Sequence, residues 1–275
     1  MPRFLKRFAI AMLVLTAVQG VARAQDAEEY EKPWSNVADL SLVAAGGNAE
    51  VLTWALSDKF TYGWTNQEIT LRVSALKTRT TVRNLSNVSG SVQVDKATET
   101  TAEEYFAAGH FRQRIVNGLY AYTIGSWYRN ELAGIRNRAG VSLGVGYLIF
   151  ETDRHFLTAE LGGDWTNEEQ LQLTRDWFGA QAILDYAFTF TETTTFDWDL
   201  AVLPNLEDTE DLRVNTVLAL TSAISSVFAL KVSYTVLFDN QPVRVLLEGT
   251  VPGEDAFFDF EKVDQRLAAS LVMNL

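Results

Sequence analysis

The C-terminal segment of this chain alternates between two kinds of side chain up to its last residue. Between residues 263 and 275, every second position is mostly apolar and the positions between them are mostly polar. A period of two residues indicates a β-strand with two different faces. In a membrane barrel, one face of each strand contacts lipid and the other lines the lumen. The segment therefore predicts the closing strand of a barrel, provided that the chain is exported.

The first 24 residues have the three-part layout of a secretory signal. A basic stretch precedes an apolar run over residues 8–18, and Ala22-Arg23-Ala24 ends the layout, which predicts cleavage after Ala24. A membrane-anchoring helix is the alternative, but this apolar run is shorter than the roughly 20 residues that a spanning helix needs. We expect a signal peptide at residues 1–24, a periplasmic N-terminal segment at 25–38 and a barrel at 39–275.

Twelve stretches of the mature part alternate in the same way and predict β-strands. No later stretch is long and apolar enough for a membrane-spanning helix, so a membrane location requires closed β-structure. An even number of strands is typical of bacterial outer-membrane barrels. The prediction is an all-β fold, a transmembrane antiparallel up-and-down β-barrel of about 12 strands. The predicted strands are residues 39–45, 53–62, 68–78, 103–113, 119–130, 137–150, 155–165, 177–190, 196–203, 212–222, 227–239 and 262–275.

Short and long connections alternate between these strands. After the first turn, which is also tight, the longer connections include residues 80–102 and 240–261, whereas residues 63–66 and 151–154 form tight turns. Outer-membrane barrels have short periplasmic turns and longer external loops, so the pattern predicts the outer membrane of a Gram-negative bacterium. A soluble β-sandwich is the alternative, but such a fold does not require this alternation.

Charge and cysteine content exclude several classes of protein. The chain contains no cysteine, which excludes disulfides, thiol nucleophiles, cysteine metal sites and a lipoprotein anchor. Removal of the signal leaves 19 Lys and Arg residues against 35 Asp and Glu residues, a net charge of −16. A chain this acidic is not expected to bind nucleic acid.

Several short motifs resemble a known family. They are Gly47-Asn48 in the first hairpin, residues 128–135 leading to Asn137-Arg138, Leu143-Gly144-Val145-Gly146-Tyr147, Asp153-Arg154 and Glu160-Leu161-Gly162. The mature chain is similar to the putative salt-induced outer-membrane protein family, a domain of unknown function. The resemblance implies a bacterial β-barrel whose role is uncharacterised.

The predicted inner face carries charges of both signs. An anion channel favours a track dominated by arginine, so a mixed lining instead predicts ion pairs across a narrow or plugged lumen. The predicted lumen charge network consists of Arg72, Glu104, Arg112, Arg138, Glu160, Asp185, Asp197, Asp199, Arg213, Lys231, Asp264 and Arg266.

No pattern in the sequence predicts catalysis, a cofactor or a metal site. The only histidines are His110 and His155, which we expect at the lumen and the periplasmic rim, neither suited to a lipid-facing catalytic pair. The Gly-rich motifs lie within strands, where they relieve crowding instead of binding phosphate. The acidic run at residues 207–211 lacks the spacing of a calcium loop, so a solvated loop is favoured over one that binds cations.

The sequence therefore predicts a narrow passive pore for small solutes or ions. A non-transporting envelope-structural or stress-associated barrel is the main alternative, and a lipid-modifying enzyme is less favoured. The expected partners are outer-membrane lipids, lipopolysaccharide and the barrel insertion machinery.

Overall fold

The computed structural model describes residues 33–46, 50–88, 91–247 and 256–275. The predicted signal peptide lies outside the described residues. Within the described ranges, no helix is long and apolar enough to cross a membrane.

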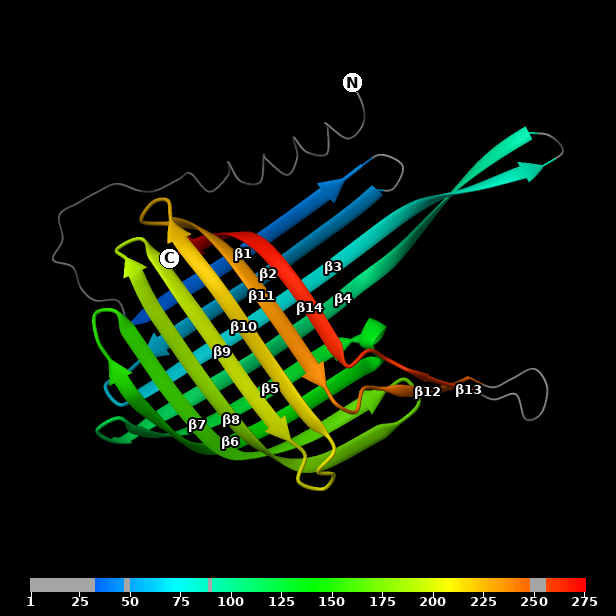
Figure 1. The fold of residues 1–275 in the computed structure, drawn as a ribbon. Coiled ribbons are helices and arrows are strands. Elements are labelled where there is room, and N and C mark those ends of the chain that lie inside the picture. Colours follow the sequence, from blue (N-terminus) through cyan, green and yellow to red (C-terminus); the bar gives the residue numbers. More distant parts are fainter. Residues whose placement is uncertain (1–32, 47–49, 89–90, 248–255) are drawn as a thin grey trace. The chain divides into compact units, whose positions relative to one another are not determined.

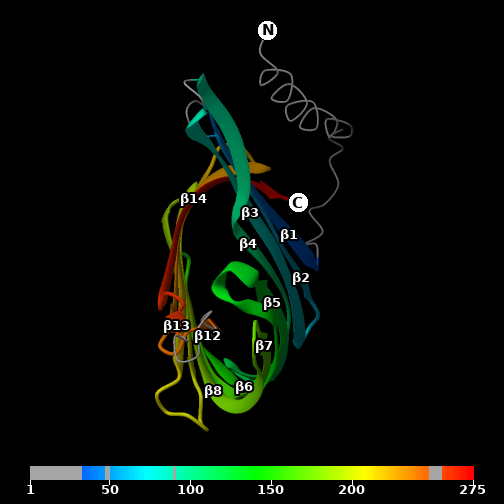
Figure 2. The same ribbon diagram turned by 90° about the vertical axis from the view of Figure 1, so that its right-hand side faces the viewer.

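Twelve antiparallel strands form one closed sheet around a lumen (Figures 1 and 2). This arrangement confirms the predicted all-β barrel and its strand number. Strands follow one another around the sheet in chain order, except that a separate hairpin of β12 (Arg244–Leu247) and β13 (Ala256–Asp259) lies between β11 and β14 in the sequence. The strands of the barrel are β1 Trp34–Ala45, β2 Glu50–Gly63, β3 Gln67–Val88, β4 Ser91–Val116, β5 Leu119–Asn130, β6 Ile135–Glu151, β7 His155–Gln170, β8 Thr174–Thr191, β9 Thr194–Pro204, β10 Leu212–Ala223, β11 Phe228–Asp239 and β14 Val263–Asn274.

The C-terminal strand closes the barrel, as its alternation predicts. β14 pairs with β11 on one side and with β1 on the other, where the register runs from Val37 opposite Asn274 to Leu40 opposite Leu271. Asn36 and Leu275 add a pair of backbone hydrogen bonds beyond that register, of 3.0 and 3.4 Å. Closure leaves the strands of the wall without a free edge, which is the condition for β-structure in a membrane.

The two faces of the wall have opposite polarity. Outward apolar side chains are open to the surroundings, with Leu143 exposed by 66% and Leu267 by 74%, whereas Glu160 and Glu168 on the inner face are buried. A soluble domain has the reverse distribution, because it buries apolar side chains in a core. Apolar side chains outside and polar ones inside are the pattern of a membrane barrel.

Two segments that the sequence predicts as loops are instead paired strands. Residues 80–88 and 91–102 continue β3 and β4 as a ribbon, which beyond Thr81 on β3 pairs only within itself (Figure 1). Threonine hydroxyls meet across the ribbon, as in the 2.8 Å hydrogen bond between Thr81 and Thr98. Such β-branched cross-strand pairs stabilise a two-stranded ribbon. Residues 240–261 likewise contain the hairpin of β12 (Arg244–Leu247) and β13 (Ala256–Asp259).

The first strand starts earlier than expected. β1 begins at Trp34, so its first five residues come from the segment 25–38 that the sequence assigns to the periplasm. A short 3₁₀ helix, η1 (Glu131–Ala133), connects β5 to β6, and Asn130 caps it by accepting a 3.1 Å hydrogen bond from the backbone N–H of Ala133.

Candidate functional site

The wall beside the candidate site is shaped by tyrosines of β5 that lie against glycines of β6 and β7. A Cβ atom on Gly146 would lie 2.4 Å from the Tyr120 ring, and one on Gly162 would lie 2.5 Å from the Tyr122 hydroxyl. Only glycine leaves room for the two rings at these positions. The Tyr120 hydroxyl can therefore donate a 2.9 Å hydrogen bond to the buried carboxylate of Glu160.

Arg112 on β4 links three carboxylates across the lumen. Its Nε donates to Glu160 on β7 at 3.0 Å, and its Nη2 donates to Asp185 on β8 at 3.2 Å. Its Nη1 donates a longer hydrogen bond, of 3.4 Å, to Glu68 on β3. The guanidinium also lies 5.3 Å from the centre of the Tyr120 ring. A buried carboxylate such as Glu160 needs this kind of pairing, because a lone charge without water is strongly unfavourable.

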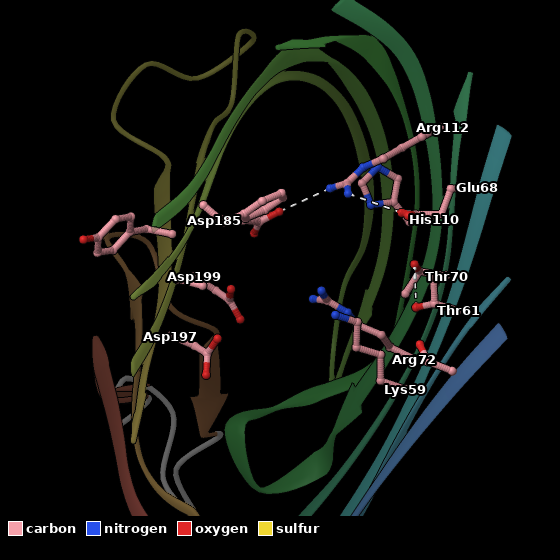
Figure 3. Close-up of a pocket in the computed structure, with 14 residues that line it drawn as sticks. Lys59, Thr61, Glu68, Thr70, Arg72, His110, Arg112, Asp185, Asp197 and Asp199 are labelled. Carbon is pink, nitrogen blue, oxygen red and sulfur yellow. Dashed lines mark hydrogen bonds and ion pairs between the residues drawn. The ribbon is translucent and has the colours of Figure 1, made fainter. Parts of the chain in front are cut away.

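Next to Arg112 lies a cavity of about 360 Å³, here called the inner cavity (Figure 3). It lies in the half of the barrel near the short turns, since its charged residues stand one to six positions from the strand ends there. Hydroxyl groups also line it, and Thr61 and Thr70 hydrogen bond to each other at 3.2 Å. Its size falls in the range of roughly 300 to 1,000 Å³ that is typical of small-molecule sites.

Charges of opposite sign occupy opposite sides of the inner cavity. Lys59 on β2 and Arg72 on β3 form the cationic wall; Asp185 on β8 with Asp197 and Asp199 on β9 form the acidic wall (Figure 3). The two walls are six strands apart in the ring of twelve, so they face each other across the lumen. In the described part of the chain, neither side chain of the cationic wall has a hydrogen-bonded or ion-paired partner, and the same holds for the side chains of Asp197 and Asp199.

The register places like charges side by side within each wall. Lys59 stands directly opposite Arg72 in the pairing of β2 with β3, and Asp185 stands directly opposite Asp199 in the pairing of β8 with β9. Like charges at opposed positions of an antiparallel pair are destabilising. Each wall therefore presents a concentrated charge of one sign to the cavity.

A second group of charges lies at the end of the barrel that carries the long connections. This outer network is tightly paired: Glu168 forms ion pairs with Arg138 and with Arg175, the latter at 3.2 Å. Arg175 also reaches Asp211 at 3.4 Å, and Arg138 reaches Asp239 at 3.7 Å. Glu168 and Asp211 have fully buried side chains. We define the outer network as Arg138, Glu168, Arg175, Asp211 and Asp239.

Trp177 supports the outer network by stacking with two guanidinium groups. The Cζ atoms of Arg175 and Arg213 each lie 4.7 Å from the centre of its ring, and the tryptophan itself is buried. A cation over an aromatic face is favourable, and the interaction strengthens when water is excluded. Arg213 is thus held by stacking, since it has no ion pair with the residues that the structure describes.

The twelve residues of the predicted lumen network fall into different settings. Arg112, Glu160 and Asp185 meet in one cluster. Lys231 instead pairs with Asp39 at 2.6 Å, and Arg266 pairs with Glu104 at 3.4 Å. Asp264 has no ion pair within the described ranges. The remaining members belong to the cationic wall, the acidic wall and the outer network, or stack on Trp177: Arg72, Asp197, Asp199, Arg138 and Arg213.

Sequence reasoning missed several charges that complete these groups. Lys59 has the inward parity of β2, so the alternation of that strand is the signal that places it in the lumen. Glu168 and Arg175 were missed because the predicted strands ended at residue 165 and began again at 177, whereas β7 and β8 extend to Gln170 and from Thr174. The alternation itself continues through both residues, so the signal was present.

In the acidic run at residues 207–211, Glu207, Asp208 and Glu210 are exposed as expected, whereas Asp211 is not. Asp211 is 1% exposed and accepts a 3.2 Å hydrogen bond from Asn205, besides its ion pair with Arg175. Glu207 accepts a 3.0 Å hydrogen bond from the backbone N–H of Phe178. Among the described residues, no three His, Asp or Glu side chains come together in the way that a metal ion requires.

Comparison with known proteins gives a family and a set of similar barrels. A family model described as "Protein of unknown function, DUF481" matches residues 38–246. The uncharacterized protein YdiY of Escherichia coli (strain K12) is 27% identical over 173 residues, which are 61% of this chain and 63% of that relative. The chain thus spans less than two thirds of the length of YdiY.

Solved structures similar to this barrel include outer-membrane proteins of very different sequence. The NanC porin matches with a TM-score of 0.44 and 10% identity over 87% of this chain and 97% of its own. The translocator domain of the autotransporter NalP from Neisseria meningitidis matches with a TM-score of 0.43 and 10% identity over 98% of this chain and 96% of its own.

Proposed function

Because this chain belongs to the family of proteins of unknown function DUF481, we propose a function from its own geometry: a narrow passive pore for small polar solutes or ions in the outer membrane of a Gram-negative bacterium. The family match confirms the resemblance that the sequence motifs indicate. The observation that carries the proposal is the inner cavity, a space inside the barrel whose charged lining includes groups of both signs without ion-pair partners.

The distribution of polarity supports the membrane location. A closed wall with apolar side chains outside satisfies its backbone hydrogen bonds internally and presents a surface that lipid can solvate. We further expect contacts with outer-membrane lipids and lipopolysaccharide, insertion by the barrel insertion machinery, and no catalysis.

The lining of the inner cavity supports a pore with weak ion selectivity. Three cationic residues and four acidic ones line it, so neither sign dominates the field along the barrel axis. The paired side chains of the outer network occupy part of the other half of the lumen, which favours a narrow passage. The lining residues with charge are Lys59, Arg72, Arg112, Glu68, Asp185, Asp197 and Asp199.

Electrical recording from the refolded protein in planar bilayers tests the proposal. We expect small current steps with weak ion selectivity. Arg112→Ala removes a side chain that joins strands four places apart in the ring, so it should enlarge the steps and shift selectivity toward cations. A shift in gel mobility between unboiled and boiled samples shows independently that the barrel is folded before boiling. A folded barrel without current would overturn the pore and favour the non-transporting envelope-structural alternative.

A further inference from the structure

We infer that the inner cavity binds small zwitterionic solutes, which carry one carboxylate and one ammonium group, between its cationic and acidic walls. The inference names a substrate class for the proposed pore and in that sense rests on the proposed function. It starts from four charges of the cavity lining whose side chains form no hydrogen bond or ion pair within the described residues: Lys59 and Arg72 on one side, Asp197 and Asp199 on the other.

The two walls place like charges at neighbouring positions, and their repulsion is unfavourable for folding. Lys59 and Arg72 are register partners, as are Asp185 and Asp199, so each wall brings two like charges together, with Asp185 alone already paired to Arg112. Several other lumen charges are joined to opposite charges by the register or by side-chain reach, as in the 2.6 Å pair of Lys231 with Asp39. A ligand with both charges removes the cost on both sides at once.

The geometry of the barrel keeps the two walls from neutralising each other. They lie on hairpins six strands apart in a closed ring, so the unpaired groups act on one another across open space without contact. Both cations of the cationic wall are exposed to the lumen. A bridging solute of matching polarity completes the interaction that the protein alone does not make.

The chemistry of the walls selects a zwitterion over a singly charged solute. The guanidinium of Arg72 and the ammonium of Lys59 are donors only, which suits a solute carboxylate. The carboxylates of Asp197 and Asp199 accept hydrogen bonds, which suits a solute ammonium. An anion alone is attracted by one wall and repelled by the other, and a cation meets the reverse situation. Only a solute with both groups gains from both walls.

Equilibrium binding to the refolded barrel in detergent micelles tests the inference without requiring passage of solute. The three probes are L-alanine, isobutyrate and 3-methylbutan-2-amine in its ammonium form, measured by ligand-observed NMR titration. Isobutyrate replaces the ammonium of alanine by a methyl group, and the amine replaces the carboxylate by an isopropyl group. We expect alanine to bind about tenfold more tightly than either analogue, because a hydrogen bond to a charged group adds roughly that factor.

Paired substitutions identify the walls as the binding site. Lys59→Gln with Arg72→Gln, or Asp197→Asn with Asp199→Asn, should weaken alanine binding about tenfold. The acidic-wall pair should also strengthen isobutyrate binding, since it removes repulsion. Matched controls remove the same charges from lumen residues that do not line the cavity: Lys231→Gln with Arg266→Gln, and Asp39→Asn with Glu104→Gln. These controls should change alanine binding by less than about twofold.

The outcomes distinguish failure of the inference from failure of the proposed function. Alanine that binds no more tightly than both analogues overturns the inference, even if the wild-type barrel conducts ions. Equal losses in the wall variants and in the controls also overturn it. Selective alanine binding in a barrel that passes no current supports the inference and removes the pore. The comparison of the three probes uses the wild-type protein, so it does not depend on the folding of any variant.

Discussion

The outer network and the inner cavity use the same kinds of residue and differ in how the register arranges them. In the outer network, Glu168 on β7 stands between its register partners Arg138 and Arg175. In the inner cavity, Lys59 is instead the register partner of Arg72. In the outer network, opposite charges on neighbouring strands form ion pairs that occupy the lumen. In the inner cavity, like charges on neighbouring strands do not pair, so a cavity remains with an electric field between its two walls. The arrangement of charges, more than their number, separates the filled part of the lumen from the open part.

The largest expected difference between the two regions is in stability. Glu168→Gln leaves two guanidinium groups of the outer network without their buried carboxylate, so the free energy of unfolding should fall by about 3 kcal/mol. Asp197→Asn, in the inner cavity, should lower it by less than about 1 kcal/mol, because Asp197 has no partner to lose. Urea unfolding of the two variants in the same detergent measures both values.

Equal losses in Glu168→Gln and Asp197→Asn would contradict this distinction. That result would mean that both regions depend on their charges for stability in the same way, and that the charges of the inner cavity do have stabilising partners.

A smaller effect of opposite sign is expected at the cationic wall. Arg72→Gln removes a like charge from the position opposite Lys59, so the free energy of unfolding should stay the same or rise by about 0.5 kcal/mol. The matched substitution Arg138→Gln, in the outer network, should lower it. The same urea assay compares them. A clear loss of stability in Arg72→Gln would show that this arginine has a stabilising partner after all.

The smallest effect is expected for an ion pair outside both regions. Arg244 and Asp259 pair across the β12–β13 hairpin, where both side chains are exposed, and the guanidinium holds the pKa of the carboxyl below its ordinary value of 3.8. The pair therefore contributes above about pH 4 and loses its contribution as pH falls through the lower pKa of the folded state.

An NMR titration of the Asp259 carboxyl tests the exposed pair. The midpoint should lie below 3.8, and Arg244→Gln should move it upward while the unfolding midpoint of the barrel stays unchanged. A titration midpoint of Asp259 that is the same in the wild type and in Arg244→Gln would contradict the pairing. The result allows the contribution of an exposed ion pair to the free energy of unfolding to be compared with that of the buried ion pairs of Glu168.

Most of the barrel wall could be predicted because its faces differ so strongly. Alternation located all twelve strands, and β5 agrees with its prediction at both ends. The ribbon of β3 and β4 was missed because its segment is rich in threonine, serine and asparagine and carries no continuous alternation of apolar and polar residues. In the structure threonines pair across the ribbon, as Thr80 and Thr101 do at 3.0 Å. No apolar face marks the ribbon, since it does not border a core.

The candidate site was predictable only in part. Alternation assigned Arg72, Asp197 and Asp199 to the inner face, and the tight turn at residues 63–66 places Lys59 opposite Arg72. The reach of long side chains was not predictable, because Arg112 on β4 contacts Glu160 three strands away over the ring of Tyr120. That contact depends on glycines of β6 and β7, whose sequence positions alone do not show what lies against them.

Ion selectivity of two charge variants in planar bilayers tests most directly whether the inner cavity is the solute path. Lys59→Gln with Arg72→Gln should shift the reversal potential in a salt gradient toward cation selectivity, because the acidic wall is left alone. Asp197→Asn with Asp199→Asn should shift it toward anions, and Lys231→Gln with Arg266→Gln should move it less. Opposite shifts of the two wall variants are the predicted result. Identical selectivity in both, with currents as in the wild type, would contradict the account.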